Sequence, residues 1–226
     1  TLGRENILKI YTKDPEFRFF MSIQILLIVV CTLVMISHQY FDSSWQDFEQ
    51  VVFQAVSIST TTGYTTSNFA EWPSFVPMLL IIASFIGGCA GSVGGGLRVA
   101  RILVLYLQGA RELKRFVHPN LVYPIKWGKN VLDERVIGSI WAFFSAYLLV
   151  FTICLLSVIA CGVEPFDAFN AVLASINNLG PGLGSVSSNM TAMPDSAKWI
   201  LTIAMVCGRL EIFTLLALFT PAFWKE

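Results

Sequence analysis

Hydrophobic residues along this chain gather in long blocks that short polar segments separate. Three blocks, at 19–36, 137–160 and 197–219, each contain about 18 or more residues with almost no charge, enough for a helix that crosses a bilayer. A fourth and shorter block, at 73–88, ends in glycines. The pattern predicts an all-α integral membrane protein, because surface helices of a soluble domain carry charged residues on the face turned to water.

A short amphipathic helix is predicted between the first two spans, over residues 44–59. Ser44 and Asp47 form a capping box at its start, and apolar residues then recur at helical spacing. Sixteen residues at 1.5 Å each give roughly 24 Å, which is too short to cross the hydrocarbon core of about 30 Å. The helix therefore ends inside the apolar layer, at the hydroxyl-rich run Ser57-Ile58-Ser59-Thr60-Thr61-Thr62-Gly63-Tyr64-Thr65-Thr66.

A hydroxyl-rich loop at the C-terminus of a helix is suited to hold a cation. Its carbonyl oxygens replace the water around the ion, and the negative end of the helix dipole attracts the ion. The alternative is an ordinary surface turn, and this stretch alone favours neither interpretation.

The same order of elements returns later in the chain. A second short helix contains Phe169-Asn170-Ala171-Val172, which matches Phe53-Gln54-Ala55-Val56. It ends at Asn177-Asn178-Leu179-Gly180-Pro181-Gly182, where Gly180 takes the place of Gly63. The repetition predicts two tandem units of span, half-helix, glycine-bearing loop and span, and it favours the cation site over the surface turn.

These units divide the chain into four parts. An interfacial approach at 1–18 leads into the first repeat at 19–116, and a cytoplasmic loop at 117–130 separates this from the second repeat at 131–226. Basic residues gather before the first span and in the middle loop, whereas acidic residues dominate the other connections. By the positive-inside rule, both termini and the middle loop are cytoplasmic and the glycine-bearing loops face outside.

Glycines interrupt the second span. Six of them fall within residues 87–96, and each costs a helix about 1 kcal/mol relative to alanine. The break is expected roughly 24 Å below the outer face, where unpaired backbone is tolerated only against protein or a water-filled path. A phosphate-binding loop is a weak alternative, because no Lys-Ser/Thr pair follows the glycines.

Composition excludes several other classes of function. The 15 Lys and Arg residues balance 15 Asp and Glu residues, and no basic-aromatic patch suggests a nucleic-acid partner. The five cysteines lie apart in apolar segments without CxxC spacing, so neither disulfides nor a metal centre is expected. No nucleophile-base pair stands out, and the protein is not expected to be an enzyme.

Four segments carry a family resemblance: Thr60-Thr61-Thr62-Gly63-Tyr64, Asn177-Asn178-Leu179-Gly180-Pro181-Gly182, the glycine-rich break, and Cys207-Gly208-Arg209-Leu210-Glu211. In these segments the chain resembles the potassium channel-like transporters of the Trk/Ktr/HKT superfamily, and most of all the C-terminal half of a bacterial Trk-type potassium uptake pore subunit. The resemblance covers essentially all 226 residues. It implies potassium transport across the bacterial cytoplasmic (inner) membrane, with potassium as the substrate and no covalent cofactor.

The resemblance also implies site residues. Backbone carbonyls of two loops would each line one quarter of a potassium filter, with Thr60, Thr61, Thr62 and Gly63 in the first and Asn177, Asn178, Leu179 and Gly180 in the second. The second loop departs from the Thr-Thr-Gly form, which leaves the role of its side chains open. An intramembrane gating loop with Arg209 beside it would lie below the filter and contain Gly88, Gly91, Gly94, Gly95 and Gly96.

Family members carry four such repeats around one pore, so the two here resemble the third and fourth. The missing two would come from a longer chain or from a second copy. The resemblance further implies a homodimer in membrane lipid and a cytoplasmic nucleotide-binding regulatory ring, for which the basic middle loop offers a surface.

The depth of Arg209 supports a role at the gate. It lies about 12 residues into its span, roughly 18 Å deep, where an arginine must face a partner or water. The structural alternative is an ion pair with Glu211, but residues two apart do not face each other on a helix.

An alternative function is a secondary transporter that moves another monovalent cation by means of discontinuous helices. Such transporters are often built from inverted repeats, whereas both repeats here are predicted to run in the same sense, which favours a pore. A non-conducting membrane scaffold is also disfavoured, because it would not need two carbonyl-bearing loops, each at the C-terminus of a half-helix.

Overall fold

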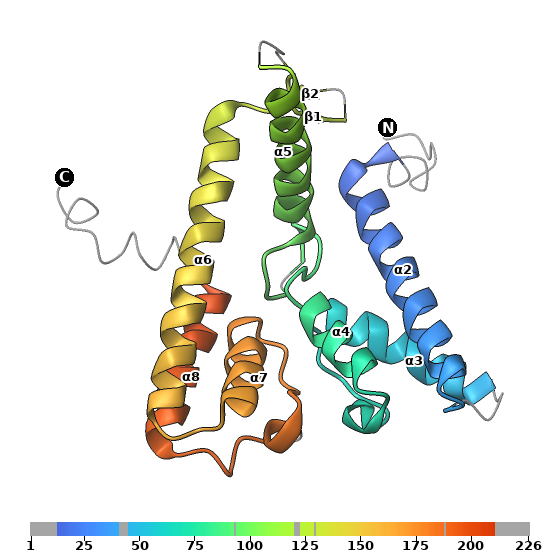
Figure 1. The fold of residues 1–226 in the computed structure, drawn as a ribbon, viewed down its shortest axis with the longest axis vertical. Coiled ribbons are helices and arrows are strands. Elements are labelled where there is room, and N and C mark those ends of the chain that lie inside the picture. The colour runs from blue at the N-terminus through green and yellow to red at the C-terminus, as the bar shows by residue number, and fades with distance from the viewer. Residues whose placement is uncertain are drawn as a thin grey trace, which may run out of the picture.

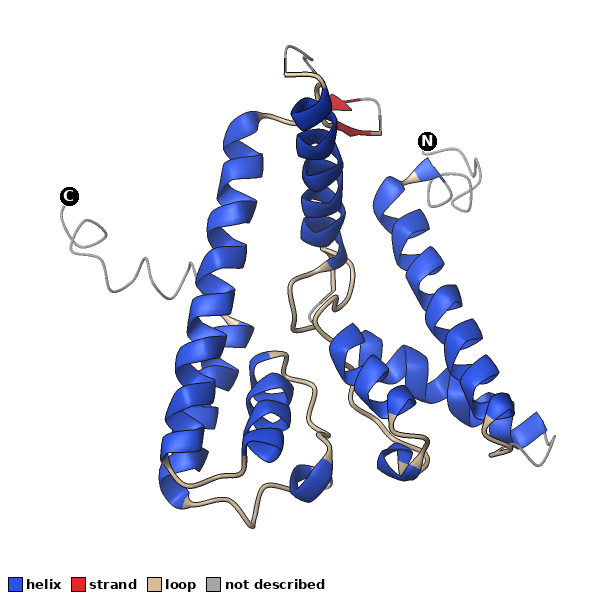
Figure 2. Cartoon of the chain, viewed as in Figure 1, coloured by secondary structure: helices blue, strands red, loops and turns tan. Residues whose placement is uncertain are grey.

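The computed structural model describes residues 13–40, 45–92, 94–119, 123–128, 130–187 and 189–210. The elements in this part of the chain run in the order α2 (Pro15–Ser37), α3 (Trp45–Ser59), η1 (Phe69–Glu71), α4 (Phe75–Ala83), α5 (Val99–Val117), β1 (Lys126–Trp127), β2 (Asn130–Val131), α6 (Glu134–Ala160), α7 (Pro165–Ile176), η2 (Gly184–Val186) and α8 (Asp195–Arg209) (Figure 1). The strands form one antiparallel pair in which Lys126 faces Val131, and helices make up most of the rest (Figure 2).

The helices α2 and α6 are long and apolar enough to cross a membrane, with 23 and 27 residues. Each begins at an aspartate whose carboxylate accepts a backbone N–H, Asp14 from Glu16 at 3.0 Å and Asp133 from Arg135 at 3.2 Å. Only 22% of the most hydrophobic window in each helix is buried.

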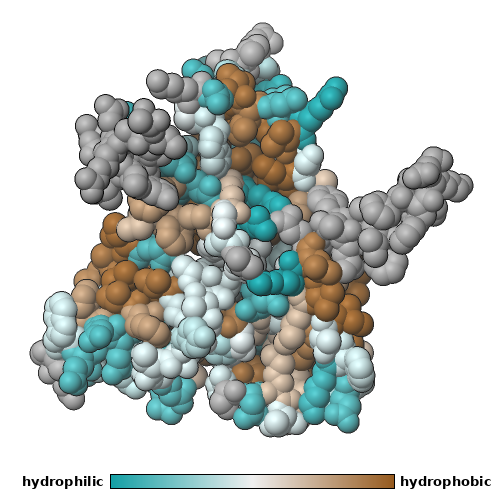
Figure 3. All heavy atoms as spheres, turned by 180° about the vertical axis from the view of Figure 1, so that it is seen from behind, coloured by the Kyte–Doolittle hydropathy of each residue, from teal (hydrophilic) through white to brown (hydrophobic). Residues whose placement is uncertain are grey.

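The outward faces of these two helices are apolar. Leu26 on α2 and Leu156 on α6 are 62% and 60% exposed. A core helix of a soluble protein would bury such side chains, so the exposed faces suit lipid or further transmembrane helices. Hydrophobic surface is visible on both flanks of the molecule (Figure 3). The long apolar helices predicted at 19–36 and 137–160 are therefore confirmed.

The half-helices α3 and α7 lie between the longer elements. With 15 and 12 residues they are about 22 and 18 Å long, too short to cross a bilayer. The helix α3 packs on α2 and α4, and α7 packs on α6 and α8. Each repeat has its own apolar core, and Leu173, Leu179 and Leu183 of the second repeat insert into the core of the first. Burying each of these leucines stabilises the fold by about 1.5–3 kcal/mol and joins the repeats.

The glycine loop, residues 87–96, breaks the second span as expected, but the helix boundaries differ from the prediction. The helix α4 already ends at Ala83, and α5 begins at Val99 rather than at residue 97. Gly96 and Arg98 have φ angles of 79° and 68°, and this left-handed conformation cannot continue a right-handed helix.

Backbone bonds close the break upon itself. The N–H of Leu97 donates to the carbonyl of Phe85 at 2.9 Å, and the N–H of Val99 donates to the carbonyl of Gly88 at 3.1 Å. These bonds pair backbone groups that a broken helix would otherwise leave unsatisfied inside an apolar layer.

Two other boundaries also need comment. The second repeat was predicted to begin at residue 131, but Val131 belongs to β2, and the helix α6 begins at Glu134, directly after its capping Asp133. The helix α8 covers the first part of the predicted span at 197–219, and the rest of that span lies outside the described residues, as do Ser44 and Glu211.

Candidate functional site: two polar loops beside a glycine loop

The first polar loop, residues 60–63, continues directly from α3. Its N–H groups turn back to the helix: Thr61 donates to Ile58 at 3.1 Å, and Thr62 donates to Ser57 at 2.9 Å. Thr61 and Gly63 are left-handed, with φ angles of 57° and 80°. Because the N–H groups are used by the helix end, the carbonyl edge of the loop is the part that can meet a ligand.

The second polar loop, residues 177–180, has the same backbone. Asn178 donates to Ser175 at 3.1 Å, and Leu179 donates to Ala174 at 2.9 Å. Asn178 and Gly180 are left-handed, with φ angles of 52° and 98°. Gly180 thus adopts the conformation of Gly63, although the two loops share no other residue type.

The bonding pattern corrects the match of the half-helices. Thr60 donates its N–H to Val56, and Asn177, its equivalent, donates to Leu173, both at 3.1 Å. Val56 therefore corresponds to Leu173, and the predicted match of Val56 with Val172 is one residue out of register. The shared phenylalanine and valine misled the comparison, because the loops and not the apolar residues carry the geometric repeat.

The polar loops border two hollows. A hollow of about 600 Å³ lies against Gly63 of the first loop and Pro181 just after the second, with η1 at its edge. A separate cavity of about 430 Å³ lies against the threonines of the first loop and Asn178 of the second. The loops thus have one polar space at their glycine end and another at their helix end.

The glycine loop closes on the helix end of both polar loops. The N–H of Gly95 donates to Thr61 Oγ1 at 2.9 Å. A β-carbon on Gly94 would lie 3.1 Å from the Thr60 oxygen, and one on Gly95 would lie 1.8 Å from the Asn177 oxygen. Backbone can approach this closely only where the side chain is a hydrogen atom.

The other predicted gate glycines are placed differently. Gly88 lines the 430 Å³ cavity, and a β-carbon on Gly96 would lie 2.9 and 3.1 Å from the Ser84 and Phe85 carbonyl oxygens. Gly91 has no neighbouring heavy atom within 4 Å of a β-carbon built on it and does not line this cavity. The structure therefore brings four of the five glycines to the site and leaves Gly91 at its margin.

Arg209 ends α8 and lines the same 430 Å³ cavity. It also borders a narrow space of about 20 Å³ with Gly94, Gly96 and Arg98. The guanidinium thus lies beside the glycine loop, on the side of the polar loops where the helices end.

Several contacts at the site were not predicted. The tip of the glycine loop is held by both backbone groups of Ala90: its N–H donates to the Glu16 carboxylate at 2.5 Å, and its carbonyl accepts from Arg98 at 3.1 Å. Gln24 on α2 and Ser59 exchange buried hydrogen bonds of 2.8 and 3.0 Å. A glutamine within an apolar span was the available signal, since such polar residues usually have a partner.

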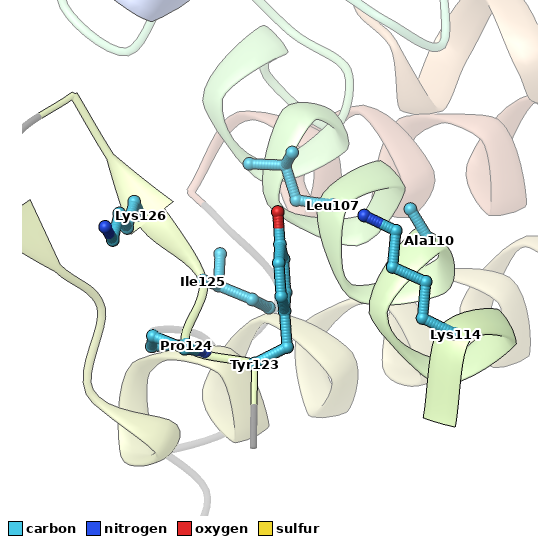
Figure 4. A pocket seen from close by; sticks show the side chains of 7 residues that line it. All are labelled: Leu107, Ala110, Lys114, Tyr123, Pro124, Ile125 and Lys126. Atoms are coloured by element: carbon cyan, nitrogen blue, oxygen red, sulfur yellow. The ribbon is translucent and has the colours of Figure 1, made fainter. Parts of the chain in front are cut away.

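A further cavity of about 300 Å³ lies at the other end of α5 (Figure 4). Leu107, Ala110 and Lys114 of α5 face residues 123–126, and Lys114 Nζ lies 4.4 Å from the centre of the Tyr123 ring. Near this end the buried Arg111 bonds the carboxylate of Glu134, and this bonding raises the pKa of the guanidinium. These contacts fix α5 to the start of α6, far along the helix from the glycine loop.

Known proteins share this sequence and fold. A family described as "TrkH: Cation transport protein" matches residues 8–226. The chain is 57% identical over 218 residues to the Trk system potassium uptake protein TrkH of Vibrio parahaemolyticus, and 44% identical over 224 residues to that of Halomonas elongata. The alignments cover 96% and 99% of this chain but 45% and 46% of those proteins.

The crystal structure of the potassium transporter TrkH from Vibrio parahaemolyticus superposes with a TM-score of 0.90 over 96% of this chain and 46% of that one. The prediction of a potassium-channel-like membrane fold is thereby confirmed. The chain spans less than half the length of the relatives it matches, and it belongs to the TrkH family of cation transport proteins.

Proposed function

We propose that this chain forms half of a potassium-conducting pore. The observation that carries the proposal is the pair of polar loops, each placed at a half-helix C-terminus with its N–H groups turned back to the helix. Carbonyl oxygens of such loops can replace the hydration shell of K⁺, and the helix dipoles add negative potential at the same place. The names of the relatives, which are potassium uptake proteins, agree with this choice of ion.

The proposed pore is incomplete in this chain. Two loops supply two quarters of a ring, and the other two come from the rest of a longer chain or from a second copy. The coverage of 45% of the relatives' length supports the first source. In this proposal, two copies of the complete pore protein associate as a homodimer.

The glycine loop and Arg209 form the proposed gate. The loop contacts Thr61 and approaches the carbonyls of Thr60 and Asn177, so it stands where an ion would leave the filter. Arg209 adds a positive charge beside the same cavity, which repels a cation. In this proposal, Arg209 holds the glycine loop across the path of the ion.

The proposed orientation places the chain in the bacterial cytoplasmic membrane with both termini inside. Lys114 and Arg115 lie in the last turn of α5. The acidic residues Glu71, in η1, and Asp195, at the start of α8, lie at the end of the molecule where the half-helices begin. Positive charge on the α5 side supports a cytoplasmic position for that end. The same basic end would meet the regulatory nucleotide-binding ring.

The alternative of a secondary transporter with inverted repeats is disfavoured by the direction of the chain. The helices α2 and α6 both begin at the end of the molecule where the β1–β2 pair lies, and they run the same way (Figure 1). Parallel repeats around an axis suit a pore better than alternating access by inverted halves.

The test is ion flux through the full-length parent protein, purified and reconstituted in liposomes. A gradient of K⁺ should drive flux that Na⁺ does not match, and Gly180→Ala should reduce this selectivity. Gly138→Ala on α6, where no atom lies within 4 Å of the new carbon, is the matched control. Equal flux of both ions through the unmutated protein would exclude a potassium filter.

A further inference from the structure

Resting on the proposed filter, we propose that Tyr147 and Ser84 are positioning residues that fix the second polar loop and thereby set its selectivity. They act through the Asn177 side chain, which they hold at both ends of its amide. The inference concerns residues outside both polar loops and outside the glycine loop.

The three side chains form one hydrogen-bonded chain. The Tyr147 hydroxyl donates to Asn177 Oδ1 at 2.6 Å, and Asn177 Nδ2 donates to Ser84 Oγ at 2.9 Å. The Ser84 hydroxyl donates in turn to the Ile81 carbonyl at 2.6 Å. Because the Ser84 hydroxyl proton is used on the Ile81 carbonyl, Ser84 Oγ accepts from the amide nitrogen, and this fixes which way the amide faces.

The network is buried and joins separate parts of the fold. Tyr147 is 2% exposed, and Ser84 and Asn177 are fully buried. Tyr147 belongs to α6 of the second repeat, whereas Ser84 directly follows α4 of the first. The start of the second polar loop is therefore attached to both repeats at once.

The first polar loop is held in another way at the equivalent position. Thr60 donates its hydroxyl to the Val56 carbonyl at 2.7 Å, within its own helix end. In the described part of the chain, the Asn177 side chain has no such local bond and bonds Tyr147 of α6 and Ser84 after α4 instead. Thr60 and Asn177 thus anchor the same backbone conformation in two different ways.

Asn177 also meets the gate through its backbone. Its carbonyl oxygen is the atom that a β-carbon on Gly95 would approach to 1.8 Å. A shift of Asn177 would change both the direction of a filter carbonyl and the surface on which the glycine loop rests. Carbonyl sites discriminate K⁺ from Na⁺ through the number and placement of their oxygens. The hydrogen bonds that hold the Asn177 amide therefore affect selectivity.

The hydroxyl of Tyr147 can be removed without disturbing its ring. The ring packs against Phe85 and Phe143, with centroids 6.1 and 6.4 Å away. Tyr147→Phe keeps this packing and leaves Asn177 Oδ1 buried without its donor, which is more costly than losing an exposed bond. The amide can then rotate or take up water, and the loop is released from one side.

The test uses the full-length parent protein in liposomes, with the K⁺/Na⁺ permeability ratio, the K⁺ flux and the melting temperature measured for each variant. For Tyr147→Phe the ratio should fall about five- to tenfold, the factor expected from one buried hydrogen bond. The matched control is Tyr106→Phe, at a tyrosine of α5 that is 65% exposed, and its ratio should not change.

Ser84→Ala provides a second and independent break in the chain of bonds. If the network works as a unit, the double variant should lower the ratio by less than the product of the single effects. A lower melting temperature with an unchanged ratio in both single variants would overturn the proposal and leave these residues a purely structural role.

Gly63→Ala, measured in parallel, separates this inference from the proposed filter. If Gly63→Ala lowers the ratio and the Tyr147 and Ser84 variants do not, only the inference fails. If Gly63→Ala also leaves the ratio unchanged, the assignment of the filter itself is wrong.

Discussion

Gly63 lies against the carbonyl group of Leu179, so close that a β-carbon on Gly63 would stand 2.0 Å from the Leu179 oxygen. The two polar loops, 177–180 and 60–63, are therefore in backbone contact, although more than a hundred residues separate them in the sequence. The glycine serves two purposes here: it adopts φ = 80°, and it leaves room for the neighbouring loop.

Gly63→Ala should lower potassium selectivity in the full-length protein, and Gly180→Ala should lower it less. Both positions have positive φ, which costs alanine about 1–2 kcal/mol. Only Gly63 adds a clash, since no atom lies within 4 Å of a β-carbon on Gly180. Permeability ratios of the two variants in liposomes check the order, and equal effects would mean that the contact with Leu179 is unimportant.

Gly95→Ala should raise potassium flux, because the new methyl group cannot fit beneath Asn177 and the glycine loop must move away from the polar loops. Gly91→Ala lies in the same loop and meets no atom within 4 Å, so it should leave flux near that of the unmutated protein. The K⁺ flux of each variant, measured under conditions that close the unmutated pore, distinguishes Gly95→Ala from Gly91→Ala. A closed pore in Gly95→Ala would show that the gate lies elsewhere.

Arg209→Ala should raise flux and weaken regulation while the permeability ratio stays the same. The arginine lines the cavity on the helix side of the polar loops. Removing a fixed positive charge lowers the barrier to a cation at that point. If flux falls in a protein that is folded and inserted in the membrane, the arginine is structural.

The 226-residue chain alone should not conduct as a monomer. Two loops surround only part of an ion, and a partly dehydrated K⁺ is not stabilised without ligands on the remaining side. Reconstituted at low density, the chain should give no selective flux. Flux that grows with the square of the protein density would instead indicate that two copies complete the ring.

The sequence predicted the spans and the broken helix well because both depend on local composition. The blocks at 19–36 and 137–160 lie within α2 and α6, and the glycine loop separates α4 from α5. The register of the half-helices was predicted wrongly, since Phe53 and Phe169 look alike while the repeat is carried by left-handed residues such as Thr61 and Asn178.

Contacts between distant segments could not be predicted. Nothing in the sequence around Asn177 shows that its amide bonds Tyr147 and Ser84, because Tyr147 comes from α6 and Ser84 from the residue that follows α4. Likewise Glu16 was assigned to an interfacial approach, and its bond to Ala90 depends on how α2 packs beside the glycine loop. Such bonds follow from tertiary packing rather than from any local pattern.

The attachment of α5 near Glu134 has a mechanical consequence. Arg111 fixes the helix to α6 about twelve residues from its start, or roughly 18 Å from the glycine loop. A rotation of α5 by about 10° around this point would move the loop end by about 3 Å, roughly the width of a water molecule. The helix would then act as a rigid lever, and in the proposed gate a small tilt of α5 would displace the end of the glycine loop by about the width of one water molecule.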